Sequence, residues 1–293
     1  MNISHLFGSK KVVYSLEVFP PKKTNSVDTI YNTLYGLRGL PVDFISVTYG
    51  AGGSDTQKNK TCEIASLIKS EYRIEPVTHL TCLNSTKEEI VATLDRLKEN
   101  GIQNILALRG DKNPAVEPKH DFTYASDLVK FIQEYDPSFN IVGACYPECH
   151  ADCDSLEQDI ENLKRKIDAG VTSLMTQLFF DNDKFYHFMD KVVQAGITVP
   201  IEAGIMPITN KSQIERTVSM CGASLPSKFT RIINKYADDP AALKDAGISY
   251  AVNQIADLIA NDVRGIHLYT MNSVETATNI TNSIKSMITA CNK

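Results

Sequence analysis

Two short apolar segments of this chain end in charged residues that stand next to chain-breaking residues. The first reads Ser-Leu-Glu-Val-Phe-Pro-Pro over residues 15–21 and brings the carboxylate of Glu17 near the end of a predicted strand. The second reads Ile-Leu-Ala-Leu-Arg-Gly-Asp over residues 105–111 and ends in Arg109, Gly110 and Asp111. Taking an unpaired charge out of water costs free energy, so such a residue does not stabilise a buried strand. At the carboxyl end of a parallel barrel strand, this placement is typical of an active site.

Eight strand-like segments recur along the chain, and amphipathic helical stretches separate them. The expected strands span residues 12–18, 44–49, 75–81, 104–109, 140–146, 173–180, 200–206 and 265–270. Several are almost continuously apolar, as expected of strands that helices cover. Thr86 and Glu89 form a capping-box pattern at the start of one intervening helix, which ends at Asn100-Gly101. Eight alternations of strand and helix predict an α/β fold, a closed (β/α)8 TIM barrel.

Only the stretch between the seventh and eighth strands is longer than one crossover needs. It contains helical patterns over residues 212–221, 226–236 and 240–261. Neither a Gly/Ser-rich linker nor an internal repeat separates this stretch from the rest of the sequence. We therefore expect extra helices on the barrel and a single domain over residues 1–293.

Polar residues gather at the ends of six of the expected strands. In a barrel these ends meet on the face where ligands bind, so a shared site explains the set better than unrelated loop residues do. The set comprises Glu17, Thr48, Tyr49, His79, Thr81, Arg109, Gly110, Asp111, Tyr146, Glu148, His150 and Gln177. No G-x-G-x-x-G motif follows a strand, so a dinucleotide would not bind here in a Rossmann site.

The helix expected over residues 154–169 carries a carboxylate, an amide and two cations close together. Asp159, Asn162 and Lys166 stand at i, i+3 and i+7 and share a face, and Arg165 lies beside that face. These groups suit a ribose and a diphosphate. The spacing alone, however, favours an ordinary solvated helix face.

Composition narrows the class of protein. The net charge of −5 gives no basic field for nucleic acid, and no apolar run reaches the length of a membrane span. The N-terminus lacks a signal-peptide pattern and the seven cysteines lack disulfide-scaffold spacing, so we expect a cytoplasmic protein. Cys145, Cys149, His150 and Cys153 have side chains that bind zinc, but their spacing matches no common finger, and we expect no metal.

Eight motifs in order along nearly the whole chain closely resemble those of methylenetetrahydrofolate reductases. They are Ser-Leu-Glu-Val-Phe-Pro-Pro (15–21), Ser-Val-Thr-Tyr-Gly-Ala (46–51), His-Leu-Thr-Cys (79–82), Leu-Arg-Gly-Asp (108–111), Tyr-Ala-Ser-Asp-Leu-Val (124–129), Tyr-Pro-Glu-Cys-His (146–150), Asn-Leu-Lys-Arg-Lys-Ile-Asp-Ala-Gly (162–170) and Gln-Leu-Phe-Phe-Asp (177–181). The resemblance is to the short bacterial form of this family. It implies a flavin-containing barrel that reduces 5,10-methylenetetrahydrofolate to 5-methyltetrahydrofolate in one-carbon and methionine metabolism. It further implies FAD or FMN as cofactor, NAD(P)H (in the first place NADH) as electron donor, and a homo-oligomer.

The resemblance also implies roles for the matching positions. Glu17 corresponds to the general acid that assists opening of the folate ring, and Asp111 to a carboxylate near the flavin and the folate. Flavin-contacting positions are matched by Thr48, Tyr49, Ala51, His79, Arg109, Gly110, Asp111, Ala125, Tyr146, His150, Asp159, Asn162, Arg165 and Lys166. Substrate-contacting positions are matched by Glu17, Thr48, Asp111, Gln177 and Gln213. The resemblance therefore assigns the helix over residues 154–169 to flavin binding.

Two departures from the family pattern keep a second function open. Thr217 stands where the family often has an aromatic residue that stacks on the folate, and Ser273 replaces a common arginine. These changes allow a flavin-binding subunit of a larger redox complex that takes electrons from a partner protein. A flavin-free lyase or aldolase with Glu17 as base would need a lysine at a strand tip or a metal cluster, and neither is convincing in the sequence.

Overall fold

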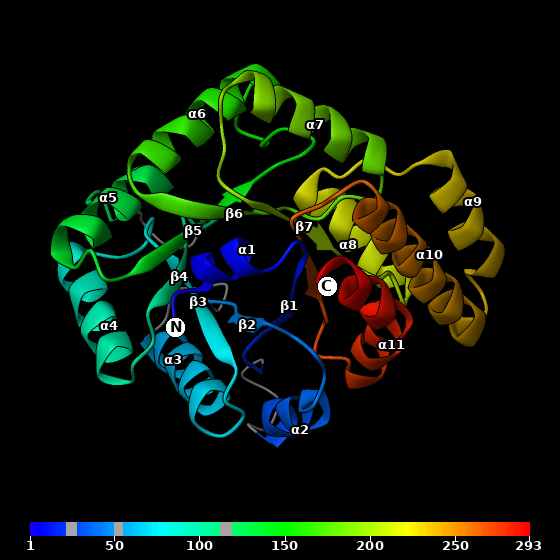
Figure 1. Cartoon of the computed structure of the whole chain (residues 1–293), viewed down its shortest axis with the longest axis horizontal. Helices are drawn as coiled ribbons and strands as arrows, with labels where there is room; N and C mark the ends of the chain where they lie inside the picture. The colour runs from blue at the N-terminus through cyan, green and yellow to red at the C-terminus, as the bar shows by residue number, and fades with distance from the viewer. Residues whose placement is uncertain (22–27, 50–54, 112–118) are drawn as a thin grey trace.

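The computed structural model describes residues 1–21, 28–49, 55–111 and 119–293, and these form a closed barrel of eight parallel strands (Figure 1). The strands follow one another in chain order, and β8 closes the barrel by pairing with β1. They are β1 (Val13–Val18), β2 (Phe44–Val47), β3 (Glu75–Thr81), β4 (Asn104–Leu108), β5 (Asn140–Cys145), β6 (Val171–Thr176), β7 (Ile201–Ile205) and β8 (Gly265–Tyr269). The predicted (β/α)8 TIM barrel is confirmed.

Helices surround the ring of strands (Figure 1). They are α2 (Asp28–Leu37), α3 (Asp55–Ser70), α4 (Lys87–Glu99), α5 (Ala125–Tyr135), α6 (Leu156–Asp168), α7 (Asn182–Gln194), α8 (Lys211–Cys221), α9 (Ser227–Tyr236), α10 (Pro240–Ala260) and α11 (Val274–Cys291). The capping box predicted for Thr86 and Glu89 is present at the start of α4, where each residue satisfies the other's backbone N–H. The extra helices expected between the last two strands are α8, α9 and α10.

The N-terminal segment closes one end of the barrel. A short 3-10 helix (Ile3–His5) and α1 (Leu6–Ser9) lie over the centre of the strand ring (Figure 1). Their apolar side chains join one buried cluster with side chains from six strands, namely Val13, Phe44, Val77, Leu106, Val142 and Met175. Most of these side chains stand in the amino-terminal half of their strand, so the apolar layer fills that end of the barrel, and ligands bind at the opposite, carboxyl end in this fold.

The sixth strand differs from the prediction at both ends. It begins at Val171 instead of residue 173 and ends at Thr176 instead of residue 180. Beyond Thr176 the apolar run leaves the sheet, and side chains of α10 bind its carbonyl groups. Gln254 Nε2 donates to the carbonyl of Phe179 at 3.0 Å, and Tyr250 Oη donates to that of Phe180 at 2.7 Å. A continuous apolar run could not show this exit, because Phe179 and Phe180 stay buried beyond the strand, where their rings stack on Phe185 of α7 and Phe229 of α9.

Helix α10 packs very closely on the chain that follows β7. A Cβ atom added at Gly247 would lie 1.7 Å from the carbonyl oxygen of Ile208, so only glycine permits this crossing.

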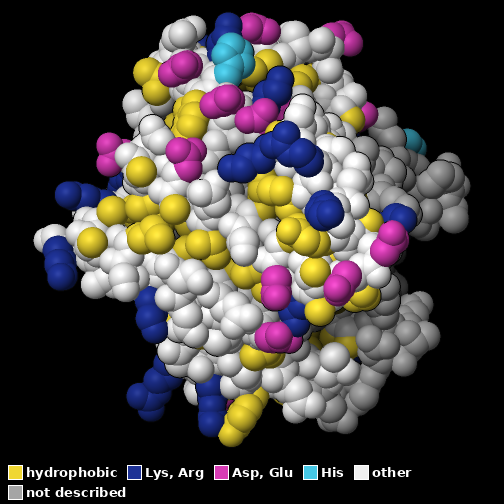
Figure 2. Space-filling view, turned by 90° about the vertical axis from the view of Figure 1, so that its right-hand side faces the viewer, with side chains coloured by type: hydrophobic (Ala, Val, Ile, Leu, Met, Phe, Trp, Pro, Cys, Tyr) yellow, Lys and Arg dark blue, Asp and Glu magenta, His cyan; other side chains and the backbone are white. Residues whose placement is uncertain are grey.

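Basic and acidic side chains are interspersed on the face that α9, α10 and α11 present to solvent (Figure 2). Within the described ranges, every helix is too short or too polar to cross a bilayer.

Candidate active site

The interior of the barrel changes from apolar to polar toward the carboxyl ends of the strands. Strand β1 shows the change, because Val13 lies in the apolar layer whereas Ser15 and Glu17 contact polar side chains from other strands. Alternate residues of a strand share a face, so these three side chains all point inward. Polar inward-facing side chains also come from β2, β3, β7 and β8, and they are Ser46, His79, Glu202, His267 and Tyr269.

Glu17 lies between two histidines at this polar end. Its Oε2 atom is 3.4 Å from Nε2 of His79 and 3.6 Å from Nε2 of His267, and its side chain is 15% exposed. Nε2 of His79 is buried and makes no hydrogen bond to any described residue. Burial lowers the pKa of His79 to about 4, although the nearby Glu17 carboxylate opposes the shift. At neutral pH, His79 is therefore an uncharged neighbour of Glu17.

The backbone that carries Glu17 is held from the end of β8. Thr270 Oγ1 donates to the carbonyl of Glu17 at 2.6 Å. Two residues further on, the side-chain amide of Asn272 binds both the N–H and the carbonyl of Phe19, at 3.1 and 2.9 Å. Asn272 adopts a left-handed conformation with φ of 56°, which asparagine tolerates better than most residues. These bonds fix the strand tip, so the position of Glu17 is set by the scaffold.

A second group of polar residues lies where α6 packs on the end of β5. Nζ of Lys166 donates to the carbonyl of Ala144 at 2.9 Å, and Oδ2 of Asp159 accepts from the N–H of His150 at 2.9 Å. Burial lowers the pKa of Lys166, and the negative charge of Asp159 opposes that shift. Both side chains therefore point toward the β5 end of the barrel.

Asn162 and Arg165 extend the same group toward solvent. Nη1 of Arg165 donates to Oδ1 of Asn162 at 3.3 Å, and Nδ2 of Asn162 contacts Sγ of Cys153 at 3.5 Å. The helix face proposed from spacing thus brings a carboxylate, an amide and two cations together. Ser155 fixes the register of the helix, since its hydroxyl caps the N–H of Gln158.

The ends of β4 and β5 meet beside this helix face. Arg109 Nη1 forms an ion pair with Asp152 Oδ2 at 2.8 Å. The rings of Tyr146 and His150 pack edge to face with centroids 4.6 Å apart. Burial, and then the positive charge of Arg109, lowers the pKa of His150, and burial raises the pKa of Tyr146 to about 12. Both rings are uncharged at neutral pH and can pack against a planar ligand.

The remaining predicted residues that the structure describes lie at the same end of the barrel. Thr48 and Tyr49 follow β2, and Ala125 is the buried first residue of α5. Gly110 has φ of 89°, and a Cβ atom there would lie 3.1 Å from that of Thr81. Asp111 is exposed. Ala51 lies outside the described residues.

The two glutamines predicted to contact substrate behave differently. Gln177 directly follows β6, and its N–H donates to the carbonyl of Cys145 at 2.8 Å, which ties it to the end of β5. The side-chain oxygen of Gln213 instead accepts from the N–H of Thr209 at 2.7 Å and from that of Asn210 at 3.2 Å. Gln213 therefore organises the turn that precedes α8, and its amide nitrogen is the group left to meet a ligand.

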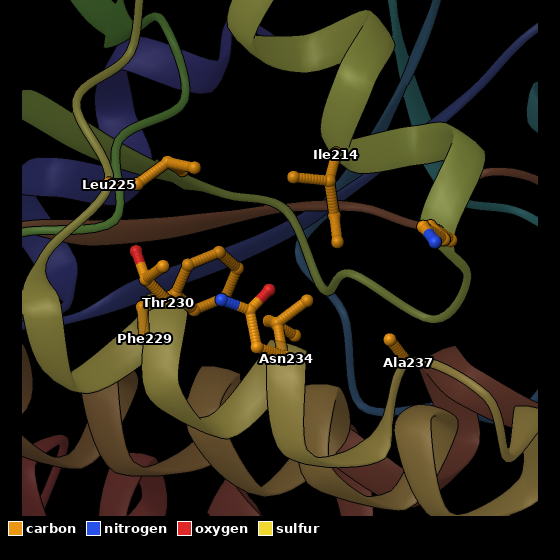
Figure 3. A pocket seen from close by; sticks show the side chains of 8 residues that line it. Ile214, Leu225, Phe229, Thr230, Asn234 and Ala237 are labelled. Carbon is orange, nitrogen blue, oxygen red and sulfur yellow. The ribbon is translucent and has the colours of Figure 1, made fainter.

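A cavity of about 130 Å³ lies between α8 and α9 (Figure 3). Ile214 from α8 faces Phe229, Thr230 and Asn234 from α9, and Leu225 and Ala237 close its two sides. Among the side chains that the structure describes around it, Lys211 is the only charged one. The cavity contains none of the residues predicted from the sequence, so we do not assign the chemistry to it.

Two residues at which the chain departs from the family pattern have structural roles. Thr217 is buried on α8, with Oγ1 3.9 Å from the sulfur of Met206. Ser273 is the N-cap of α11, where its hydroxyl accepts from the N–H of Thr276 at 3.3 Å. Cys145, Cys149 and Cys153 are free thiols, and the described part of the chain contains no group of three metal-binding side chains.

Sequence reasoning missed the polar residues below Glu17. Glu202 and His267 are fully buried within β7 and β8, and Ser15 Oγ lies 3.0 Å from Oε1 of Glu202 and 2.7 Å from Nδ1 of His267. The available signal was a glutamate or a histidine inside each predicted strand, at Ile-Glu-Ala-Gly-Ile and Gly-Ile-His-Leu-Tyr. Both residues lie inside their strands, so a prediction based on strand ends does not include them.

Comparison with known proteins gives a consistent result. The family described as "Methylenetetrahydrofolate reductase" matches residues 2–285. The chain is 36% identical over 261 residues to the 5,10-methylenetetrahydrofolate reductase of Escherichia coli (strain K12), which covers 89% of this chain and 86% of that protein. It is 35% identical over 287 residues to "Methylenetetrahydrofolate reductase (NADH) 1" of Zea mays, and this alignment covers 93% of this chain and 48% of that protein. The chain spans about half the length of the fungal and plant relatives it matches.

Among solved structures, an uncharacterized protein from Clostridium thermocellum has a similar fold. The two chains superpose with a TM-score of 0.67 at 16% identity, over 98% of this chain and 99% of the other. That protein is described as binding two copies of 5-methyl-5,6,7,8-tetrahydrofolic acid. At this level of identity the likeness shows the barrel fold alone.

Proposed function

The chain belongs to the methylenetetrahydrofolate reductase family, and we propose that it reduces 5,10-methylenetetrahydrofolate to 5-methyltetrahydrofolate, using a bound flavin and NAD(P)H. The observation that carries this proposal is the placement of Glu17 at the carboxyl end of β1. There its carboxyl group is partly exposed and lies within 3.6 Å of two imidazoles. A proton-exchanging group at this position matches the acid that the reaction requires.

Glu17 would act on the five-membered ring of the folate. That ring must open to an iminium before the methylene carbon can accept hydride, and opening requires a proton on the departing nitrogen. Glu17 is held by the bonds to its strand tip and faces the open end of the barrel, so it can deliver this proton to a bound folate. His79 beside it is neutral at neutral pH, so no positive charge on that ring holds Glu17 in its ionised form.

The residues beside α6 fit a flavin by the chemistry of their donors. Lys166 uses one of its three ammonium hydrogens on the carbonyl of Ala144, and Arg165 bonds only a neutral amide among the groups described around it. Neither cation forms an ion pair among the described residues, so both suit the phosphates, and Asp159 and Asn162 suit the ribityl or ribose hydroxyls. When bound, the flavin supplies the hydride transfer between the nicotinamide and the folate.

The other residues complete the proposed contacts. We assign flavin binding to Thr48, Tyr49, Ala51, His79, Arg109, Gly110, Asp111, Ala125, Tyr146 and His150, and folate binding to Glu17, Thr48, Asp111, Gln177 and Gln213. We propose FAD as the flavin and NADH as the donor. The maize relative is named as an NADH enzyme, which supports the donor. The structural neighbour from Clostridium thermocellum is described as binding 5-methyltetrahydrofolate, the product of the proposed reaction.

The wider setting follows from the same proposal. We assign the protein to one-carbon and methionine metabolism in the cytoplasm, as a homo-oligomer of one flavin-binding domain per chain.

One anaerobic experiment tests the function. The purified protein, saturated with FAD, is mixed first with NADH and then with methylenetetrahydrofolate while flavin absorbance is followed. We expect NADH to bleach the flavin and the folate to restore its colour. If dithionite but neither NADH nor NADPH reduces the flavin and the folate then reoxidises it, the chain is a subunit that needs a partner donor. A protein that binds no flavin would contradict the proposal.

A further inference from the structure

A continuous line of polar side chains runs from Glu17 into the closed half of the barrel. Nε2 of His267 lies 3.6 Å from Oε2 of Glu17, and Nδ1 of the same ring lies 2.7 Å from Oγ of Ser15. Ser15 Oγ lies 3.0 Å from Oε1 of Glu202. The line therefore joins two carboxyl groups through one imidazole and one hydroxyl, and each of these can both give and accept a proton.

Glu202 is an unusual residue for the interior of a barrel. Its side chain is fully buried, and Oε2 has no hydrogen-bond partner among the described residues. The fold makes room for it, because a Cβ atom on the neighbouring Gly265 would lie 2.5 Å from its Cγ. Burying a polar oxygen without a hydrogen-bond partner costs free energy even when the carboxyl group is protonated, so stability alone does not explain this residue.

We propose that Glu202 stores the proton that loads Glu17, and that Ser15 and His267 carry this proton between the two carboxyl groups. The inference rests on the proposed folate reduction. Glu202 is a positioning residue for the proton, since it acts through Glu17 and does not touch the substrate.

The transfer balances as a shift of three hydrogens along the line. The carboxyl hydrogen of Glu202 moves to Oγ of Ser15, the hydroxyl hydrogen of Ser15 moves to Nδ1 of His267, and the Nε2 hydrogen of that ring moves to Oε2 of Glu17. Negative charge passes from Glu17 to Glu202, and no electrons change hands. Glu17 then protonates the folate. After the product has left, Glu17 takes up one proton from solvent at the open end of the barrel, and this proton restores the neutral form of Glu202 through the same line.

Burial raises the pKa of Glu202 to about 8, so this carboxyl group holds a proton at neutral pH. The negative charge of Asp43 acts in the same direction, and hydrogen bonding with Ser15 opposes it. Other groups face the line from β3 and β8. Burial lowers the pKa of His79 to about 4 and raises the pKa of Tyr269 well above its ordinary value, so both stay uncharged while Glu202 titrates.

The proposal predicts how Glu202 exchanges its proton with water. Since Glu202 is fully buried, the line through Ser15 is its route to solvent. In the flavin-loaded protein transferred to D₂O, infrared spectroscopy should show a protonated carboxyl band that Glu202→Gln removes. In Ser15→Ala this band should take up deuterium at least about tenfold more slowly. Ser173→Ala is the matched control, because it removes a fully buried hydroxyl from β6 that has no partner among the described residues.

Half-reaction kinetics supply the second readout. We expect Glu202→Gln and Ser15→Ala to slow folate reduction by about tenfold or more near pH 8 and to approach the parent rate in acid, where solvent loads Glu17 directly. Reduction by NADH should be unchanged. Parent-like folate rates in both variants at every pH, or unchanged deuterium uptake in Ser15→Ala, would overturn the relay. If the parent protein itself does not reduce the folate, the proposed function fails, and the deuterium experiment still decides whether the relay exists.

Discussion

Oε2 of Glu17 lies 3.4 Å from Nε2 of His79, an imidazole whose side chain is 9% exposed. Burial keeps this ring uncharged at neutral pH, since the pKa of His79 falls to about 4. A protonated histidine at this distance would hold Glu17 in the ionised form through a salt bridge. The neutral ring places no positive charge beside Glu17, as the proposed role of Glu17 as general acid requires.

Glu17→Gln should separate the two half-reactions. The amide keeps the size and hydrogen bonding of the side chain but cannot supply a proton to the folate nitrogen. We expect flavin binding and reduction by NADH to be near the parent values, and folate reduction to fall by ~10²–10⁴-fold. Stopped-flow absorbance of the flavin measures both steps, and Glu134→Gln on the exposed face of α5 serves as the control.

Two results would argue against this role. If Glu17→Gln reduces the folate at the parent rate, Glu17 is not the acid. If both half-reactions and the melting temperature fall together, Glu17 is a structural residue at the strand end.

His79 should make the stability of the protein depend on pH in a defined window. A histidine in the unfolded chain binds a proton near pH 6.5, whereas His79 in the folded protein does so only near pH 4. Between these values the unfolded state binds more protons, so the free energy of unfolding falls as the pH is lowered through the window, by about 3 kcal/mol in total.

Urea unfolding at a series of pH values measures this dependence. His79→Asn should flatten the curve between about pH 6.5 and pH 4, while His187→Asn, at an exposed position of α7, should leave it unchanged. An unchanged slope in His79→Asn would mean that His79 is not the buried neutral imidazole.

The sequence predicted this site unevenly, for physical reasons. Glu17 was recognisable because a charge beside two prolines marks the end of a strand, and strand ends in a barrel converge. Glu202 was not, because its meaning depends on Ser15, which lies 187 residues away in the chain and meets it only when the barrel closes. Lys166 was ambiguous, since spacing on a helix cannot tell a solvated face from one that packs on the carbonyl of Ala144.

The strand predictions show the same limit. Near-continuous apolar runs located all eight strands, yet the end of β6 was misplaced because Phe179 and Phe180 are buried outside the sheet, where their rings stack on Phe185 of α7 and Phe229 of α9. Burial is visible in a sequence, but the partner that provides it is not.

Gly247→Ala should destabilise the protein strongly. The added methyl group would lie 1.7 Å from the carbonyl oxygen of Ile208, and neither backbone segment can move without displacing α10. We expect a loss of about 1–3 kcal/mol or more in the free energy of unfolding. Gly8→Ala is the control, since nothing lies within 4 Å of its new Cβ atom. Equal stabilities of the two variants by urea titration would contradict the close packing of α10.

Asp111→Asn should raise the reduction potential of the bound flavin. A carboxylate near the N1 region of the flavin disfavours the anionic reduced form, and the amide removes that charge. Spectroelectrochemical titration measures the potential, with Asp121→Asn as a control in an exposed segment that precedes α5. A potential that stays constant or falls in Asp111→Asn would remove Asp111 from the flavin site.

Replacement of the cations on α6 should weaken flavin binding in proportion to their contact with phosphate. Lys166 and Lys164 are two residues apart on the same helix, but their surroundings differ. Lys166 is largely buried against β5 and bonds a backbone carbonyl. Lys164 is 36% exposed in its side chain and forms an ion pair with Glu161 at 3.0 Å. Of these two lysines, only Lys166 faces the end of the barrel where we place the flavin.

A charge-assisted hydrogen bond to phosphate is worth roughly 1.5–3 kcal/mol, which corresponds to a loss of about 10–150-fold in affinity. We therefore expect Lys166→Ala and Arg165→Ala to raise the dissociation constant for FAD by such factors, as measured by quenching of flavin fluorescence. Lys164→Ala removes the same charge from the same helix and should bind FAD like the parent protein. Equal losses in Lys164→Ala and Lys166→Ala would show that only the overall charge of α6 matters. Unchanged affinity in both Lys166→Ala and Arg165→Ala would place the flavin elsewhere.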